Sequence, residues 1–302
     1  MPIKCIAGLC LAMQIFMVKP ARAQAEIKPS DTIQKPWIRW ALPGAMTASL
    51  PVLYQLWYKE NSTSQFHFFN DNPEWFQMDK LGHAFTVNLL QDRYTEYLEK
   101  AGYKRNKAAA LACGYTLGYL TIIEVMDGFG KGWGFSAGDM AANVAGSLLF
   151  WGQDRLWGKQ KIQMRFSWSP SPYRKMRPTL LGENHLAAII KDYNAQTYWI
   201  SFPLEGLPAR WGKLLMISLG TGAKGMLGAR SNVYTENNIT YYYTDIPRYR
   251  CWYLSADINL RDIKTKSKWA NRLLHTFGFI KVPFPALEFS GARGLRFLPW
   301  MF

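Results

Sequence analysis

Apolar stretches of helical length dominate the first half of the chain, and residues 36–158 are predicted to form four helices. The uncharged run 40–58 is long enough to cross a bilayer, although Pro43 and Pro51 would kink it. Residues 80–100 carry one apolar face, which is typical of a half-buried helix. The run 108–123 is apolar all round but too short for a comfortable span, so it fits the centre of a bundle better. A fourth helix is predicted over about 138–157, and the short loops indicate a compact four-helix bundle.

The pattern changes after Trp157 to short runs rich in β-branched and aromatic residues, which follow a Pro- and Ser-rich linker at 167–178. The predicted fold class is therefore α+β, with the helical domain 36–158 followed by an antiparallel β domain over 159–302. Six to eight strands, roughly, would suffice to close a small barrel, and the terminal phenylalanine is common in outer-membrane barrels. Pro299 and untidy alternation favour an open sheet instead, so both forms stay open. We interpret GTGAKG (220–225) as a Gly-rich hairpin turn and not as a dinucleotide site.

Residues 1–23 have the features of a signal peptide: Lys4, a short apolar core, and a small-x-small site at Ala21-Arg22-Ala23. The mature chain is therefore expected outside the cytoplasm, in the periplasm or at the outer membrane. The run AGLC offers a second possibility, in which Cys10 is lipidated and anchors the chain. Leu9 is bulky for the position before such a cysteine, and the apolar run continues beyond it.

Charge is unevenly distributed. The net charge of +15 divides into +3 for residues 1–23, −1 for 24–158 and +13 for 159–302. An exported basic surface is expected to meet a membrane or an anionic envelope polymer, and nucleic acid is a poor candidate in that compartment. The alternative is that the charge only keeps an aromatic-rich surface soluble.

Three of the predicted helices carry polar residues in pairs at turn spacing, so that each pair lies on one face. These pairs are Asp79 with His83, Glu124 with Asp127, and Asp139 with Asn143. If the faces converge, His83, Glu124, Asp127 and Asp139 would form a divalent-metal site. Acid/base chemistry is the other possibility, with His83 as base and Asp79, Lys80 and Glu124 beside it. Glu124 is the most informative member, because an ionisable group at the end of an apolar run is costly unless it is paired.

A purely structural explanation competes with this one. Asp79 would be an N-cap, Ser136 and Asp139 would form a capping box, and Asp127-Gly128 would end a helix. Caps and one buried ion pair would account for all of the polar residues except His83 and Asn143. Cys113 and Cys251 stand in no metal-binding pattern and are predicted to be small buried residues.

The motifs DK-x-x-H (79–83), E-x-x-D (124–127) and GWGFSAGDMAANVAG (132–146) together resemble those of the family of predicted periplasmic lipoproteins of unknown function typified by YfiM. More distantly, the layout resembles VanZ-like membrane proteins. The resemblance covers about 78–150 and implies an exported, membrane-associated bundle. Asp79, Lys80, His83, Glu124, Asp127, Asp139 and Asn143 are its characteristic residues. It supplies no reaction and no cofactor.

Three hypotheses follow for the function. The first is a structural or interaction protein of the envelope, since no complete catalytic motif is present. The second is a metal-assisted or acid/base hydrolase or transferase that acts on an anionic lipid or cell-wall precursor. The third is a transmembrane anchor at 40–58 with the rest of the chain peripheral. The sequence alone does not decide whether the protein is an enzyme.

Overall fold

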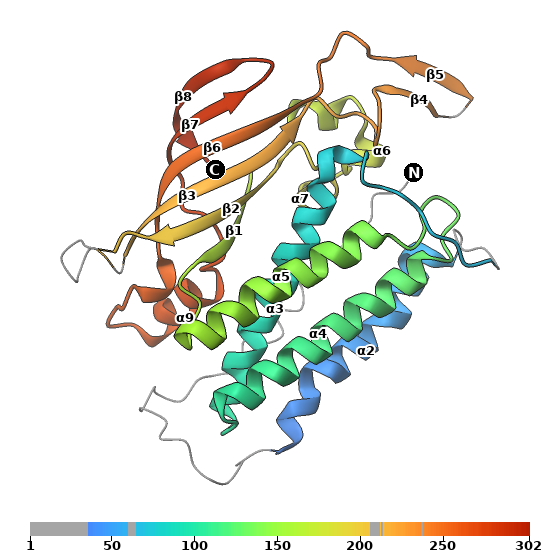
Figure 1. The fold of residues 1–302 in the computed structure, drawn as a ribbon. Coiled ribbons are helices and arrows are strands. Elements are labelled where there is room, and N and C mark those ends of the chain that lie inside the picture. Colours follow the sequence, from blue (N-terminus) through green and yellow to red (C-terminus); the bar gives the residue numbers. More distant parts are fainter. Residues whose placement is uncertain (1–35, 60–64, 206–211, 213, 237) are drawn as a thin grey trace. The chain divides into compact units, whose positions relative to one another are not determined.

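The computed structural model describes residues 36–59, 65–205, 212, 214–236 and 238–302 (Figure 1). The predicted signal peptide and Cys10 lie outside these residues. The described chain forms two compact units, one of residues 36–71 and 83–160 and the other of residues 72–82 and 161–302. Seven α-helices and eight strands in antiparallel sheets are found among the described residues, so the predicted α+β class is confirmed.

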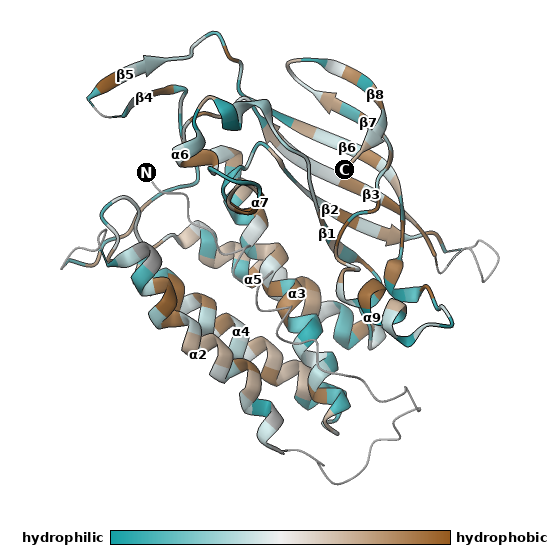
Figure 2. Cartoon of the chain, turned by 180° about the vertical axis from the view of Figure 1, so that it is seen from behind, coloured by the Kyte–Doolittle hydropathy of each residue, from teal (hydrophilic) through white to brown (hydrophobic). Residues whose placement is uncertain are grey.

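Helices lie where the periodicity predicts them. They are α2 (Ala41–Leu53), α3 (Met78–Lys100), α4 (Arg105–Asp127) and α5 (Ala137–Trp157). A four-helix bundle as such is not confirmed. The run 40–58 forms only the 13 residues of α2 before a π-helical turn at Tyr54–Tyr58. By length and composition, the one described helix that could cross a membrane is α4. Both α2 and α4 consist mostly of hydrophobic residues (Figure 2).

Helices α3 and α5 approach each other closely because residue 146 has no side chain. A Cβ atom on Gly146 would lie 2.2 Å from the carbonyl oxygen of Ala84. Polar side chains continue the contact along the two helices: the Asn88 amide donates to the Gly146 carbonyl at 3.3 Å, and the Gln91 amide donates to the Ser147 hydroxyl at 3.0 Å. This approach places His83, the neighbour of Ala84, beside the turn of α5 that carries Asn143.

The second unit is built on a six-stranded sheet in the order β1-β2-β3-β6-β7-β8. The strands are β1 (Gln163–Trp168), β2 (Gln196–Pro203), β3 (Leu215–Lys224), β6 (Tyr249–Ile258), β7 (Phe284–Ser290) and β8 (Gly294–Met301). A separate hairpin is formed by β4 (Val233–Glu236) and β5 (Ile239–Tyr242), and the short helices are α6 (Pro178–Leu181), α7 (His185–Lys191) and α9 (Lys268–Thr276). Among the described residues the sheet does not close, so the predicted barrel is not found.

Two local expectations for this unit are wrong. Pro299 does not end the last strand, which continues to Met301, although the pairing of β8 with β7 is irregular between Leu298 and Met301; a proline is tolerated at such an irregularity on an edge strand. The stretch 220–224 is part of β3 and not a turn. Its first glycine has a packing reason, since a Cβ on Gly220 would lie 2.4 Å from the indole of Trp199 on the neighbouring strand. At the opposite edge, Phe166 of β1 forms a single parallel bridge with Ile280.

Replacing Gly146 by alanine is expected to lower the free energy of unfolding by about 1–3 kcal/mol, because backbone atoms of α3 must move aside. Gly152→Ala in the same helix is the matched control. A Cβ at that position meets nothing within 4 Å, so alanine should stabilise α5 by about 0.5–1 kcal/mol. Chemical unfolding of both variants measures the difference. Equal effects would contradict the proposed close contact.

Candidate functional site: a buried histidine between two carboxylates

His83 is the centre of the polar residues in the first unit and is only 1% exposed. Its Nδ1 atom lies 3.1 Å from Oδ1, the side-chain amide oxygen of Asn143. Its Nε2 atom lies 3.7 Å from Oε1 of Glu124 and 3.9 Å from Oδ2 of Asp139. The predicted convergence of three helices is therefore observed, with His83 from α3, Glu124 from α4, and Asp139 and Asn143 from α5.

The Asn143 contact requires a proton on Nδ1 of His83. An amide oxygen only accepts hydrogen bonds, so Nδ1–H donates to it, and the Nε2 atom faces the two carboxylates. In many metal sites a histidine is oriented in this way by an acceptor on its other nitrogen. Two ligands on one tetrahedral ion with bonds of 2.0–2.2 Å lie about 3.4 Å apart. The observed 3.7 and 3.9 Å separations are close to that value.

Ser136 caps helix α5 with its side chain, whereas the side chain of Asp139 takes no part in this cap. The Ser136 hydroxyl accepts from the backbone N–H of Asp139 at 3.1 Å and donates to Asp71 at 2.6 Å. In a full capping box the Asp139 carboxylate would accept from the Ser136 N–H, but that N–H donates to Oε2 of Glu124 at 3.4 Å. The Asp139 carboxylate therefore reaches toward His83 while its backbone is capped. Capping alone does not explain this residue.

Asp127 ends α4 and has a different partner. The hydroxyl of Tyr58 donates to its Oδ1 atom at 2.8 Å, and both residues are buried. Burial, and then the carboxylate of Asp127, raise the pKa of Tyr58 well above its usual value, so the phenol stays protonated and remains a donor. Asp127 is thus held by a phenol at the end of the helix. Its role as a metal ligand stays a prediction.

Asp79 and Lys80 lie in the first turn of α3, in the segment that groups with the second unit. Helix α3 begins at Met78, so Asp79 is inside the helix and is not its N-cap. The hydroxyl of Tyr193 donates to Oδ1 of Asp79 at 2.6 Å. Lys80 is partly exposed. Asp79 precedes His83 by one turn on the same helix face, and the catalytic roles of both residues stay predictions.

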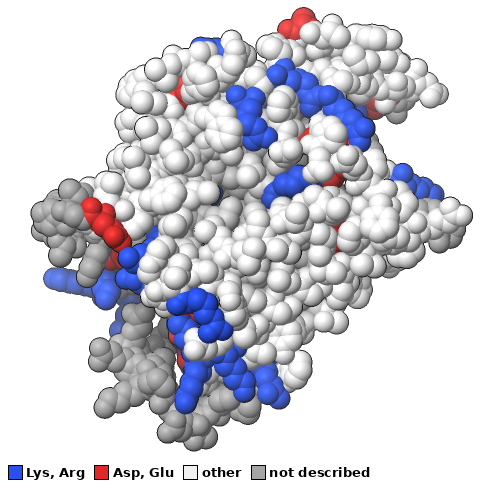
Figure 3. All heavy atoms as spheres, viewed as in Figure 1, with Lys and Arg blue, Asp and Glu red and all other residues white. Residues whose placement is uncertain are grey.

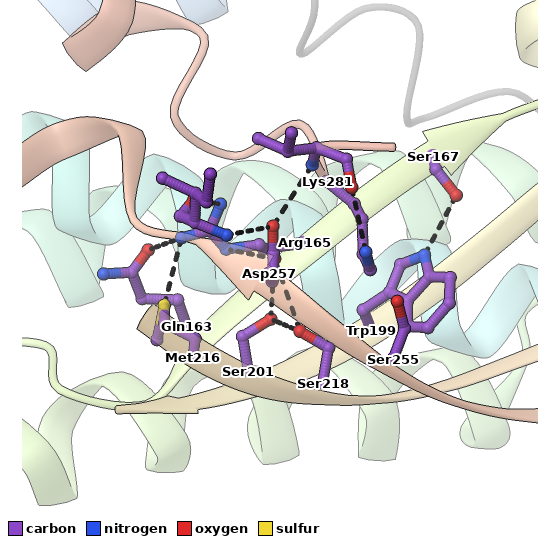
Figure 4. A network of polar contacts seen from close by, with 12 residues as sticks. Gln163, Arg165, Ser167, Trp199, Ser201, Met216, Ser218, Ser255, Asp257 and Lys281 are labelled. Atoms are coloured by element: carbon purple, nitrogen blue, oxygen red, sulfur yellow. Dashed lines mark hydrogen bonds and ion pairs between the residues drawn. The ribbon is translucent and has the colours of Figure 1, made fainter. Parts of the chain in front are cut away.

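A second buried polar cluster lies inside the sheet of the second unit (Figure 4). The guanidinium of Arg165 and the carboxylate of Asp257 are both fully buried, with Nε and Oδ2 3.3 Å apart. Ser201 and Ser218 lie 2.6 Å apart, oxygen to oxygen, and each hydroxyl is 3.3 Å from the same carboxylate oxygen. Lys281 donates to the carbonyls of Ala256 and Val282, each at 2.9 Å.

Sequence reasoning missed this second cluster because its members come from five separate segments with no shared motif. One signal was available. Ser201, Ser218 and Asp257 occupy the positions of their strands whose neighbours are apolar, which is the reverse of a sheet with its apolar face toward a core. The members of this network are paired mainly with one another, and we interpret it as a buried polar part of the sheet's inner face.

A comparison with known protein families finds a match for one part of the chain. Residues 67–150 match the family model described as predicted periplasmic lipoprotein (DUF2279). That range includes His83, Glu124, Asp127, Ser136, Asp139 and Asn143. No curated protein and no solved structure matches the chain. The match supports the predicted family of periplasmic lipoproteins of unknown function and the localisation: the protein is exported, to the periplasm or outer membrane. The YfiM-like and VanZ-like likenesses stay predictions.

The stability of the second unit should depend on the protonation of Lys281. Burial lowers the pKa of this lysine to about 8, against an ordinary 10.5. Between these two pH values the unfolded chain binds more protons than the folded one, so the free energy of unfolding should rise with pH. We expect a rise on the order of 1–3 kcal/mol from pH about 8 to about 10.5.

Lys281→Met should remove that rise in unfolding experiments at increasing pH, whatever its effect on the absolute stability. The same substitution at the exposed Lys266 is the control, since it removes a lysine without touching the network. An identical pH slope in wild type and Lys281→Met would show that the lysine does not carry this dependence.

Proposed function

We propose that this exported protein has a structural or interaction role at an anionic membrane surface of the cell envelope. The observation that carries the proposal is the basic segment 261–272, which leads into α9. It contains five basic residues and one acidic one: Arg261, Lys264, Lys266, Lys268 and Arg272, with Asp262. No residue of α9 is buried, and Trp269 is 67% exposed. An exposed tryptophan among lysines and arginines is typical of helices that lie at a lipid headgroup region.

The charge of the whole second half agrees with this role. Residues 159–302 carry +13, and basic side chains outnumber acidic ones on the face drawn in Figure 3. Broad areas of the same face carry no charge at all. Exposed large hydrophobic side chains, among them Trp252, Trp269 and Phe297, accompany this charge. A surface that combines positive charge with exposed apolar side chains suits an anionic lipid layer better than a soluble polyanion, which would need charge only.

Burial of the His83 centre favours a structural role over catalysis on a lipid. His83, Glu124, Asp139 and Asn143 are all 1% exposed or less. A lipid or wall precursor must reach the reacting groups of its enzyme, and these groups are enclosed by their own helices. The centre instead links α3, α4 and α5 through one imidazole.

Vesicle binding tests the membrane role. The full chain should sediment with phosphatidylglycerol vesicles at low salt and be released at high salt. Reversing Lys264, Lys266 and Lys268 to glutamate should weaken binding by more than about hundredfold, since the loss of each lysine near an anionic surface alone removes about 1 kcal/mol. The control is the same reversal at Lys104, Lys107 and Lys131, which are exposed in the first unit. Equal loss in both variants, or no binding by the wild type, would refute the assignment to this segment.

A metal-assisted hydrolase or transferase is the second candidate, favoured by the Nε2 atom of His83 facing two carboxylates. His83, Glu124 and Asp139 would hold a divalent ion, and Asn143 would orient the imidazole. Nitrogen and carboxylate donors suit Zn²⁺ or Mn²⁺. Such an ion would polarise a phosphoryl or carbonyl oxygen of an anionic lipid or wall precursor.

Isothermal titration with Zn²⁺ and Mn²⁺ tests the metal. Stoichiometric binding should be lost in His83→Gln and Glu124→Gln, and it should persist in His67→Gln, a variant of a histidine in the same unit but outside the centre. Circular dichroism verifies that each variant is folded. If the wild type binds neither ion, the hydrolase candidate loses its basis, while the structural role is unaffected.

A further inference from the structure

The inner face of the six-stranded sheet carries a buried polar network beside an apolar cluster around Trp199 and Tyr253, whereas its outer face carries exposed apolar side chains. On the inner face lie Arg165, Ser201, Ser218 and Asp257, each 0% exposed (Figure 4). Neighbouring positions on the same strands point to the other face and are apolar. An antiparallel sheet in water usually has one apolar face toward the core and a polar face toward solvent, so the exposed apolar outer face of this sheet is unusual.

On the outer face the apolar residues form continuous rows across the strands. One row runs directly opposite from strand to strand over five strands: Ile200, Leu219, Leu254, Leu287 and Phe297. A second row lies two residues away on three of these strands: Trp252, Phe289 and Leu295. Exposure ranges from 39% to 66% in the first row and from 54% to 70% in the second. No charged side chain belongs to either row.

The size of this surface suits one leaflet of a bilayer. Five strands spaced about 4.8 Å apart give a width of about 19 Å. Along β6, the two rows at Trp252 and Leu254 together with Ala256, which lies beyond them opposite the exposed Ile217, extend about 14 Å at 3.4 Å per residue. Half of a hydrocarbon core is about 15 Å thick. Exposed apolar areas of this extent on a protein surface mark an interaction site.

We propose that this outer face, defined by the two rows, lies against the acyl chains of an anionic lipid leaflet. The proposal rests on the proposed membrane role and names the surface that enters the lipid. Charge complementarity selects lipid over a protein partner. Strand β6 carries Trp252 and Leu254 and ends at Ile258, and the basic segment 261–272 follows directly. An apolar band that ends in lysines and arginines corresponds to acyl chains bordered by anionic headgroups.

The figures agree with this arrangement. Apolar residues recur along β2, β3 and β6 in the hydropathy view (Figure 2). The region that β7 and β8 occupy in Figure 1 shows few charged side chains in the matching space-filling view (Figure 3). The inner face holds the sheet together without the outer one, because it packs the apolar cluster around Trp199 and Tyr253 and pairs the buried charges of Arg165 and Asp257.

The test uses the full chain with vesicles of phosphatidylglycerol and phosphatidylethanolamine, with and without bromine on the acyl chains. Brominated lipid should quench tryptophan fluorescence of the wild type, and Trp252→Phe should reduce the quenched fraction. Leu254→Asp and Phe289→Asp should each weaken partitioning by about tenfold or more. Leu186→Asp on α7 is the matched control, since Leu186 is 76% exposed and lies outside the rows, and it should bind as the wild type does.

Three results would overturn the proposal. In the first, the row variants bind as the wild type does and brominated lipid quenches nothing, while salt still releases the protein; the attraction is then electrostatic only, and the membrane role stands without this face. In the second, light scattering shows that the wild type is a dimer, that the row variants are monomers, and that vesicles do not dissociate the dimer. A second copy of the chain then covers the face. In the third, folded wild type binds no vesicle, and the membrane role fails as well.

Discussion

The high cost of burying charge without a partner shapes both units of this protein. In the first unit one imidazole is enclosed with two carboxylates and an amide, and in the second a guanidinium is enclosed with a carboxylate and two hydroxyls. An isolated charge at either place would cost several kcal/mol. The helices and strands that supply these groups must therefore keep the positions in which the groups meet. The close contact at Gly146 serves the same end, because it brings the Asn143 amide within reach of His83.

Sequence patterns predicted most of the helical architecture and the convergence at His83. Turn spacing on one helix fixes which side chains share a face, and an ionisable residue at the end of an apolar run requires partners. These two facts led to Glu124, Asp139 and Asn143. Partners from outside α3, α4 and α5 were beyond such reasoning: Tyr58 on Asp127 and Asp71 on Ser136 come from segments whose position depends on the folded chain.

The β half was less predictable for a physical reason. Alternation with period two shows that strands exist, but it does not say which face is inside. A buried ion pair on the inner face, beside the apolar cluster around Trp199, goes against the usual assumption, so Arg165 and Asp257 were not recognised as core residues. Pro299 was taken as a break because its place at the sheet edge depends on strand order, which the sequence does not encode locally. The glycine at 220 was taken as a turn, whereas it makes room for Trp199.

The two borders of the sheet have a consequence for crowding in the envelope. A free edge strand offers unpaired amides to any neighbouring chain and promotes aggregation. Here Pro299 and the irregular pairing beside it interrupt the regular course of β8, and the bridge between Phe166 and Ile280 occupies part of the β1 border. Side-by-side growth of these sheets into fibres is thereby disfavoured even where many copies accumulate on a small area.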